Sequence, residues 1–314
     1  MIEVQPAAEM LAHPEAQHVP VYTVTDTKRG RVFTFDDVLF HDDRPPCDKT
    51  VVALYKSSTS DRVLLVKTIA DPASSEIGMV DHLNFALDHD VLREIMCSAR
   101  VLWRPRLRRR KHAEDDAPKP RNFYAVALSH AGNTLHSRMR FMTRPARLAV
   151  LLRVCGACTT LMTRAHVVYL DMKPSNVCLV DDDPATTRLI DYGSLSLIDT
   201  TEGVATYPPP EYPFGVDVAA NETVQAYALA VLVVVVLNPT RDTEYPLRFR
   251  NINDTPVERA AEQLEGAIAQ TIVNFNQQRC CRLLQDAVVS CLRRQGSVEA
   301  LQAALEYEVK TCTS

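Results

Sequence analysis

The pattern of apolar residues changes near residue 130, and this change limits the folds that the chain can adopt. Before that point the apolar residues form short β-type runs. TVVALYK at 50–56 and RVLLVKTI at 62–69 are separated by the polar SSTSD, which is typical of a hairpin. After it they recur at helical spacing, over 144–165 and from about residue 221 onward. We therefore predict an α+β fold that is β-rich at the front and mainly helical at the back.

This pattern predicts a division of the chain into three parts. Residues 1–20 carry three prolines and little periodicity, so we expect a loosely held N-terminal tail. Residues 21–130 combine the strands with one principal helix, expected from about residue 76 to 101. Residues 131–314 form the helical lobe. A hydrophobic content of 46% over 314 residues lets a two-lobed chain bury a sizeable core.

Charge and cysteine content exclude several classes of function. With a net charge of −4 the chain lacks the overall positive field of a general nucleic-acid binder, so we expect no specific nucleic-acid partner. The nine cysteines are scattered and no secretory signal is recognised, which favours an intracellular place in the cytoplasm or nucleus. The longest apolar run, 227–237, is about half of the roughly 20 residues that span a bilayer, so we expect no membrane association. The sequence indicates no oligomeric state.

The strongest chemical signal is the pair of segments YLDMKPSNVCLV and RLIDYGS. The first offers Asp171, Lys173 and Asn176, and the second offers Asp191, twenty residues after the first acid. Transfer of a phosphoryl group needs a carboxylate that accepts or orients a hydroxyl proton, and a cation near the transferred group. It also needs oxygen ligands for Mg²⁺, such as an amide and a second carboxylate. The four side chains match these needs.

The two segments resemble the catalytic loop and metal-binding turn of eukaryotic-type protein kinases, D-x-K-P-x-N followed by D-[FY]-G. The resemblance implies a bilobal kinase-like fold that uses ATP and Mg²⁺. In it Asp171 would be the catalytic base and Lys173 the charge stabiliser, while Asn176 and Asp191 would hold Mg²⁺. Lysine followed by proline resembles the branch that phosphorylates serine or threonine of a protein substrate.

The resemblance also implies a lysine on the strand hairpin that grips the α- and β-phosphates. Lys67 fits this role, whereas Lys56 lies at the hairpin turn. A glutamate on the following helix should form an ion pair with that lysine. We expect Glu94 to be this residue, because Glu76 is very near the predicted helix start.

The rest of the implied nucleotide site is incomplete. Val52, Ala127 and Cys178 take positions that line the adenine site in the family, with Ala127 at the back pocket and Cys178 below the base. The loop that covers the phosphates should be rich in glycine, but the corresponding segment, 41–49, contains none. Close approach of its backbone to phosphate is therefore harder.

Three further positions test the resemblance. Glu211, in PPPEY, corresponds to the glutamate that closes the activation segment, and either Arg293 or Arg294 could pair with it. Leu170 stands where the family has an arginine that receives an activation-segment phosphate, so we do not expect control by phosphorylation there. Gln225 replaces an aspartate that braces the catalytic loop, and its amide can still hydrogen-bond to backbone groups.

Other functions remain open. The missing glycines favour a pseudokinase, a binding or scaffold module without turnover, and a small-molecule phosphotransferase of the same fold is a third possibility. Cys155 and Cys158 have metal or redox spacing, but we expect core residues because no second pair accompanies them. The basic segment 104–112 could be an import signal, a docking patch or a solvated strand edge. The glycine-free loop and Tyr-Leu-Asp also resemble divergent kinases of large DNA viruses, which would place the chain in a host cell.

Overall fold

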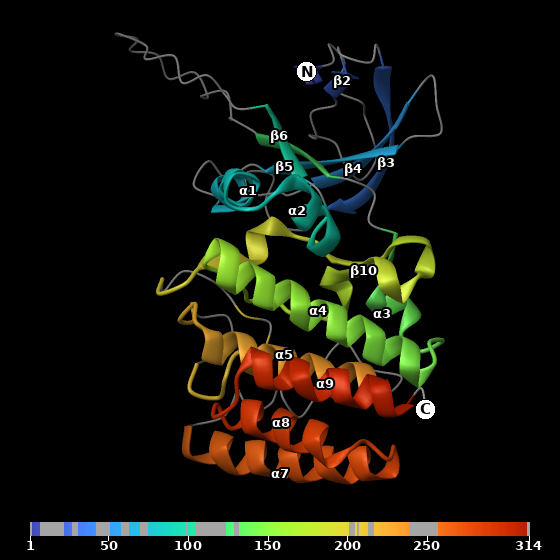
Figure 1. The fold of residues 1–314 in the computed structure, drawn as a ribbon. Coiled ribbons are helices and arrows are strands. Elements are labelled where there is room, and N and C mark those ends of the chain that lie inside the picture. The colour runs from blue at the N-terminus through green and yellow to red at the C-terminus, as the bar shows by residue number, and fades with distance from the viewer. Residues whose placement is uncertain are drawn as a thin grey trace. The chain divides into compact units, whose positions relative to one another are not determined.

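The computed structural model contains two compact units, each with its own arrangement of helices and strands (Figure 1). The first unit comprises Met1–Asp81 and Cys97–His130, and the second comprises His82–Met96 and Ala131–Ser314. The predicted boundary at residue 130 coincides with one limit between the units, whereas residues 82–96 are grouped with the second unit. The structure describes residues 2–6, 22–26, 31–41, 51–57, 63–69, 75–97, 99–103, 124–128, 132–200, 205, 207–212, 217–238 and 257–312.

The first unit is built on an antiparallel sheet of seven strands, in the order β1-β2-β3-β4-β5-β7-β6. The predicted hairpin is confirmed, because β4 and β5 are adjacent and antiparallel. The strands are β1 Ile2–Pro6, β2 Tyr22–Asp26, β3 Arg31–His41, β4 Val51–Ser57, β5 Val63–Ile69, β6 Ala99–Trp103 and β7 Tyr124–Leu128.

Two expectations for the first 101 residues are wrong. The expected tail contains β1, where Ile2 and Val4 alternate with polar residues, a short signal of strand period. The expected helix over 76–101 is divided into α1 (Ser75–Ala86), α2 (His89–Ile95) and β6. Buried apolar residues continue across the break between the helices, so their periodicity could not reveal it. They include Leu83, Leu87 and Leu92.

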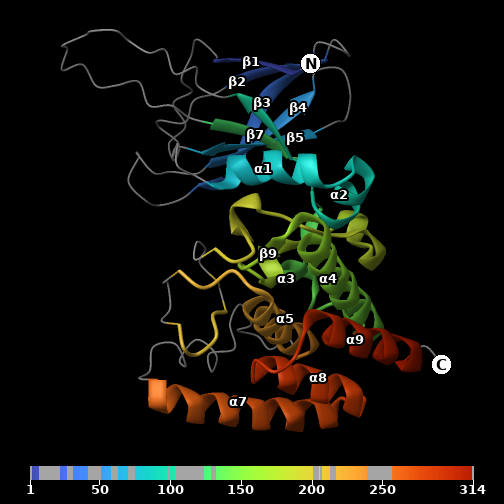
Figure 2. The ribbon, with the colours of Figure 1, turned by 60° about the vertical axis from the view of Figure 1, so that its left-hand side comes forward.

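The second unit is mainly helical, and Figure 2 shows α8 between α7 and the pair α5 and α9. Its helices are α3 Leu135–Arg138, α4 Arg144–Ala165, α5 Glu222–Leu237, α7 Val257–Gln277, α8 Arg282–Leu292 and α9 Val298–Cys312. Its strands are β8 Asn133–Thr134, β9 Val167–Tyr169, β10 Val177–Leu179, β11 Thr187–Leu189 and β12 Leu195–Leu197.

The long helix α4 begins and ends with clear local signals. Thr143 caps it by accepting a hydrogen bond from Ala146 N, and Pro145 occupies the first turn, where a missing N–H is harmless. The helix ends at His166, whose φ of 53° is left-handed. By length and composition α4 could cross a membrane, but half of its most apolar window is buried inside the protein, as in the core helix of a globular unit. It packs along α9 (Figure 1).

The apolar run 227–237 lies in α5, as predicted for a core helix. Every residue from Val224 to Leu237 is buried. Asn221 caps the helix by accepting a hydrogen bond from Val224 N. A helix that is apolar on all sides must be enclosed by other elements, and α4, α8 and α9 surround this one.

Two small sheets connect the helices to the chemical motif. β10 pairs with both β11 and β8, and β9 pairs with β12, all antiparallel. Gly132 leads into β8 with a φ of 76°, and a Cβ at this position would lie 2.0 Å from the backbone oxygen of Leu179 in β10. Glycine is therefore required where the chain enters the second unit.

Candidate active site

The loop between β9 and β10 brings together three of the side chains predicted from the motif. Lys173 Nζ lies 2.6 Å from Asp171 Oδ2. The side-chain amide of Asn176 donates to the same Oδ2 at 2.8 Å and to the backbone oxygen of Asp171 at 2.9 Å. A 3₁₀ turn over Pro174–Asn176, closed by Asn176 N donating to Lys173 O, gives the loop this shape.

This arrangement fixes the Asp171 carboxylate and leaves it partly accessible. Its Oδ2 accepts both contacts, while 18% of the side chain remains exposed. Lys173 places a positive charge directly beside the acid. Asn176 uses its amide nitrogen on Asp171, so its oxygen is the atom suited to a cation. A carboxyl group, a fixed amine and an amide oxygen thus lie within one loop.

Asp191 lies on a second turn that is joined to this loop by backbone hydrogen bonds. Ile190 N donates to Asn176 O at 3.0 Å on one side of Asp191, and Leu170 N donates to Ser194 O at 2.9 Å on the other. Asp191 itself has left-handed dihedral angles, φ 72° and ψ 86°, and Ser194 Oγ donates to its Oδ2 at 2.9 Å. Two segments twenty residues apart are therefore held in one fixed relation.

Tyr169 adds a side-chain connection that the motif did not reveal. Its phenol is fully buried and donates to the backbone oxygen of Ile190, directly before Asp191. Burial raises the pKa of this phenol well above its usual value, and the negative charges of Asp191 and Asp171 raise it further. The hydroxyl therefore stays protonated and remains a donor. No sequence pattern indicated this contact.

Gln225, in the first turn of α5, braces the loop, as predicted from its amide chemistry. Its Oε1 accepts a hydrogen bond from Tyr169 N at 2.5 Å. Its Nε2 is buried and has no hydrogen-bond partner among the described residues. The hydrogen bond from Tyr169 N thus requires an acceptor at position 225. The amide nitrogen of Gln225 makes no hydrogen bond among the described residues.

In the first unit, Lys67 forms an ion pair with a glutamate other than the predicted one. Its Nζ lies 2.8 Å from Glu76 Oε2 and 2.9 Å from Oε1, and the two side chains are 14% and 6% exposed. The prediction of Glu94 as partner is wrong. Glu94 is exposed on α2 and is grouped with the second unit, whereas Glu76 is buried in the first turn of α1, close along the chain to the end of β5.

The other predicted nucleotide-site residues are placed by strand register. Val52 in β4 is opposite Lys67, and Ala127 in β7 is opposite Val66, so both strands flank the strand that carries the lysine. Their side chains lie outside the described part of the chain. Cys178 is buried in β10 of the second unit, opposite Thr134 of β8. The roles assigned to these residues stay predictions.

A second ion pair settles which arginine pairs with Glu211. Arg294 Nη1 lies 2.6 Å from Glu211 Oε2, whereas Arg293 pairs with Glu265 at 2.7 Å. Arg294 is therefore the partner, one of the two predicted alternatives. A cavity of about 310 Å³ lies beside both pairs.

Several other sequence patterns do not form a functional site within the described residues. Cys155 and Cys158 are buried in α4, and burial raises the pKa of both thiols, as expected for core residues. Within the described ranges no group of three histidine, cysteine or acidic side chains is arranged to hold a metal ion.

Mg²⁺ in phosphoryl transfer takes few protein ligands besides the phosphates, and Asn176 with Asp191 supplies an amide and a carboxylate of that kind. Segments 42–49 and 104–112 lie outside the described residues.

The comparisons with known proteins show the fold. No protein-family model matches the sequence, and no curated protein matches it. Among solved structures, vaccinia related kinase 3 matches with a TM-score of 0.55 at 12% sequence identity, over 94% of this chain and 92% of that one. The chain therefore has a mixed α/β fold like that of a protein kinase, as the motif predicted.

Proposed function

We propose that the chain is a protein kinase that transfers the γ-phosphate of ATP to a serine or threonine hydroxyl of a protein substrate. One observation carries the proposal. Asp171, Lys173 and Asn176 converge within one loop, and that loop is bonded on both sides to the turn that holds Asp191. The kinase-like fold supports the same conclusion.

Each side chain in this loop has a distinct task in the proposed reaction. The Asp171 carboxylate orients the substrate hydroxyl and accepts its proton as the oxygen bonds to the γ-phosphorus and the bond to the β-phosphate oxygen breaks. Lys173 neutralises negative charge that develops on the transferred group. Asn176 and Asp191 would hold Mg²⁺, which would neutralise charge on the phosphates.

The proposed phosphate-binding residue of the first unit is Lys67. We propose that Lys67 binds the α- and β-phosphates and that Glu76 orients it, in place of Glu94. Their near-complete burial supports this role, because a buried ion pair holds both partners in a defined geometry. Val52, Ala127 and Cys178 are proposed to line the adenine site. The eight free cysteines among the described residues support an intracellular, reducing environment.

A pseudokinase is the second candidate, and one observation favours it. Segment 41–49 contains no glycine, so a close phosphate-covering loop is harder to form. In this alternative the polar residues around Asp171 would bind a nucleotide or stabilise the loop without turnover. The two functions differ in one measurable property, the transfer of phosphate.

The test uses the full chain with Mg²⁺, labelled ATP and a generic protein substrate. We expect label transfer by the parent protein, and a loss of about 10²–10⁴-fold in Asp171→Asn, because the proton acceptor is removed. Asp286→Asn is the matched control, since Asp286 is 67% exposed on α8. Binding of Mg–ATP without transfer would favour the pseudokinase, and the absence of both would refute the kinase proposal.

A further inference from the structure

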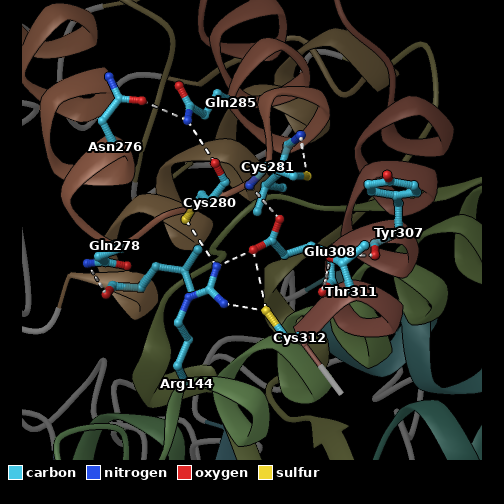
Figure 3. Close-up of polar contacts among 12 residues, drawn as sticks. Arg144, Asn276, Gln278, Cys280, Cys281, Gln285, Tyr307, Glu308, Thr311 and Cys312 are labelled. Carbon is cyan, nitrogen blue, oxygen red and sulfur yellow. Dashed lines mark hydrogen bonds and ion pairs between the residues drawn. The ribbon is translucent and has the colours of Figure 1, made fainter. Parts of the chain in front are cut away.

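A cluster of thiols surrounds a buried ion pair, apart from the catalytic loop (Figure 3). Arg144, at the start of α4, forms an ion pair with Glu308 of α9, whose side chain is 1% exposed. The same guanidinium donates to Cys280 Sγ at 3.4 Å and, through Nη1, to Cys312 Sγ. Glu308 Oε2 also accepts from Cys281 N at 2.7 Å. The cluster thus joins α4, the segment before α8 and the end of α9.

The charges in this cluster are fixed. Burial alone would raise the pKa of Glu308, but hydrogen bonds from Cys281 and Arg144 outweigh it and lower the pKa. Burial would lower the pKa of Arg144, yet its contacts with Cys280 and Glu308 raise it. A permanent cation therefore lies against two sulfur atoms. A cationic donor beside sulfur is one feature of the electropositive surroundings in which reactive cysteines lie.

The three thiols differ in access and in contact with the cation. Cys281 caps α8 by accepting from Leu284 N, and burial together with its hydrogen bond to Glu308 raises its pKa to about 11. Cys280 contacts Arg144 but is 6% exposed, and burial raises its pKa. Cys312 combines partial exposure with a contact to Arg144. Its S–H also donates to Glu308 Oε1, 3.6 Å away. It is thus the thiol best placed to react first.

We propose that Cys312 and Cys280 form a peroxide-sensitive thiol pair. The Cys312 sulfur attacks one oxygen of hydrogen peroxide, the O–O bond breaks, and a sulfenic acid and one water form. The Cys280 sulfur then attacks the sulfenic sulfur, and a disulfide forms as a second water leaves. Two thiols are oxidised and one peroxide is reduced, so atoms and electrons balance.

The end of α9 gives Cys312 the freedom that this reaction needs. Figure 3 shows the guanidinium of Arg144 between the two sulfur atoms, so Cys312 must move past it before the disulfide closes. Cys312 is the last residue of α9, and the final turn of a helix has carbonyls without intrahelical partners. Unwinding that turn breaks the bonds that its own side chains and N–H groups donate, but no later turn depends on its carbonyls. The disulfide would remove both sulfur contacts from Arg144.

The test is peptide mapping of the full chain after brief treatment with hydrogen peroxide, under non-reducing conditions. We expect a reductant-sensitive link between the peptides that contain Cys280 and Cys312. Because Cys280 and Cys281 share a peptide, Cys281→Ser is the matched control and should keep the link. In Cys280→Ser the link should disappear, and a sulfenic acid at Cys312 should react with dimedone.

Three results would overturn the proposal: no link in the parent protein, loss of the link in Cys281→Ser, or no dimedone adduct in Cys280→Ser. Thermal melting of each variant under reducing conditions checks that it is folded. The parent map needs no variant, so a variant that fails to fold does not remove the test. The readout is independent of phosphate transfer, so its outcome is separate from that of the proposed kinase function.

Discussion

Tyr169 donates a hydrogen bond from its phenol to the backbone oxygen of Ile190, the residue directly before Asp191. Asp191 has a φ of 72°, a conformation that residues other than glycine adopt at a cost in free energy. Contacts on both sides of the turn compensate for this cost, from Tyr169 on one side and from Ser194 Oγ on the other. The proposed metal ligand is thus held by the catalytic loop itself.

Replacing Tyr169 by Phe should weaken the hold on Asp191 while keeping the ring. We expect a loss of transfer rate of about tenfold, equivalent to one hydrogen bond, and a higher Mg²⁺ requirement. Transfer measured against Mg²⁺ concentration checks this. Tyr307→Phe is the control, because Tyr307 is 51% exposed on α9. An unchanged Mg²⁺ dependence in Tyr169→Phe would contradict the role.

Glu76→Gln and Glu94→Gln form a matched pair that tests the corrected ion pair. Glu76→Gln removes the negative charge that pairs with Lys67 in a mostly buried site. We therefore expect the free energy of unfolding to fall by about 3 kcal/mol. Glu94→Gln, on an exposed helix surface, should shift stability by less than about 0.5 kcal/mol. Urea unfolding measures both. Equal effects, or the reverse order, would count against the assignment.

Gln225→Leu removes the acceptor for Tyr169 N and leaves that buried N–H unsatisfied. We expect a loss of about 2 kcal/mol in unfolding free energy, together with slower transfer, since the catalytic loop loses its brace. The control is Gln277→Leu, at an exposed position of α7. Chemical denaturation and single-turnover transfer are the measurements. A stable variant with normal transfer would show that the brace is dispensable.

Arg294→Ala should affect stability much less than Glu76→Gln, although it also breaks an ion pair. The side chains of Arg294 and Glu211 are 41% and 38% exposed, so water screens their attraction. We expect a change below about 1 kcal/mol in unfolding free energy, falling further in high salt. Urea unfolding at two salt concentrations measures it, and a loss above about 2 kcal/mol would refute this reasoning.

Buried thiols predict a loss of stability at alkaline pH. Burial raises the pKa of Cys291 from 9.0 to about 12, so the folded protein keeps the proton while the unfolded chain releases it. The stabilising contribution of the protonated Cys291 thiol to the folded state is fully present below pH 9. It is lost as the pH rises from there toward 12. Urea midpoints between pH 8 and 10.5 should therefore fall, and Cys291→Ala should show a shallower fall. An equal fall of the urea midpoint in the parent protein and in Cys291→Ala would contradict this role of Cys291.

The catalytic loop could be predicted from the sequence because its geometry is local. Asp171, Lys173 and Asn176 lie within one turn, so fixed spacing in sequence becomes fixed spacing in space. Glu76 was excluded by its place near a helix start. Yet the short connection from β5 to α1 is what brings it to Lys67.

Contacts between distant segments could not be predicted in this way. Arg144, Cys280 and Glu308 come from three parts of the chain, and no periodic pattern relates them. Likewise, Tyr169 reaches Ile190 through a bond that depends on how β9 and β12 pair. The choice of Arg294 over Arg293 also depends on tertiary packing, because the two are neighbours in sequence.

The burial of α5 has a consequence for changes in chain length. A helix turns by about 100° per residue, so deleting one residue before Gln225 would rotate the amide away from Tyr169. Because α5 is apolar on all sides, such a rotation would still present apolar side chains to the neighbouring helices. The phase of this helix therefore determines whether the catalytic loop is supported, a requirement that the burial of apolar side chains alone does not impose.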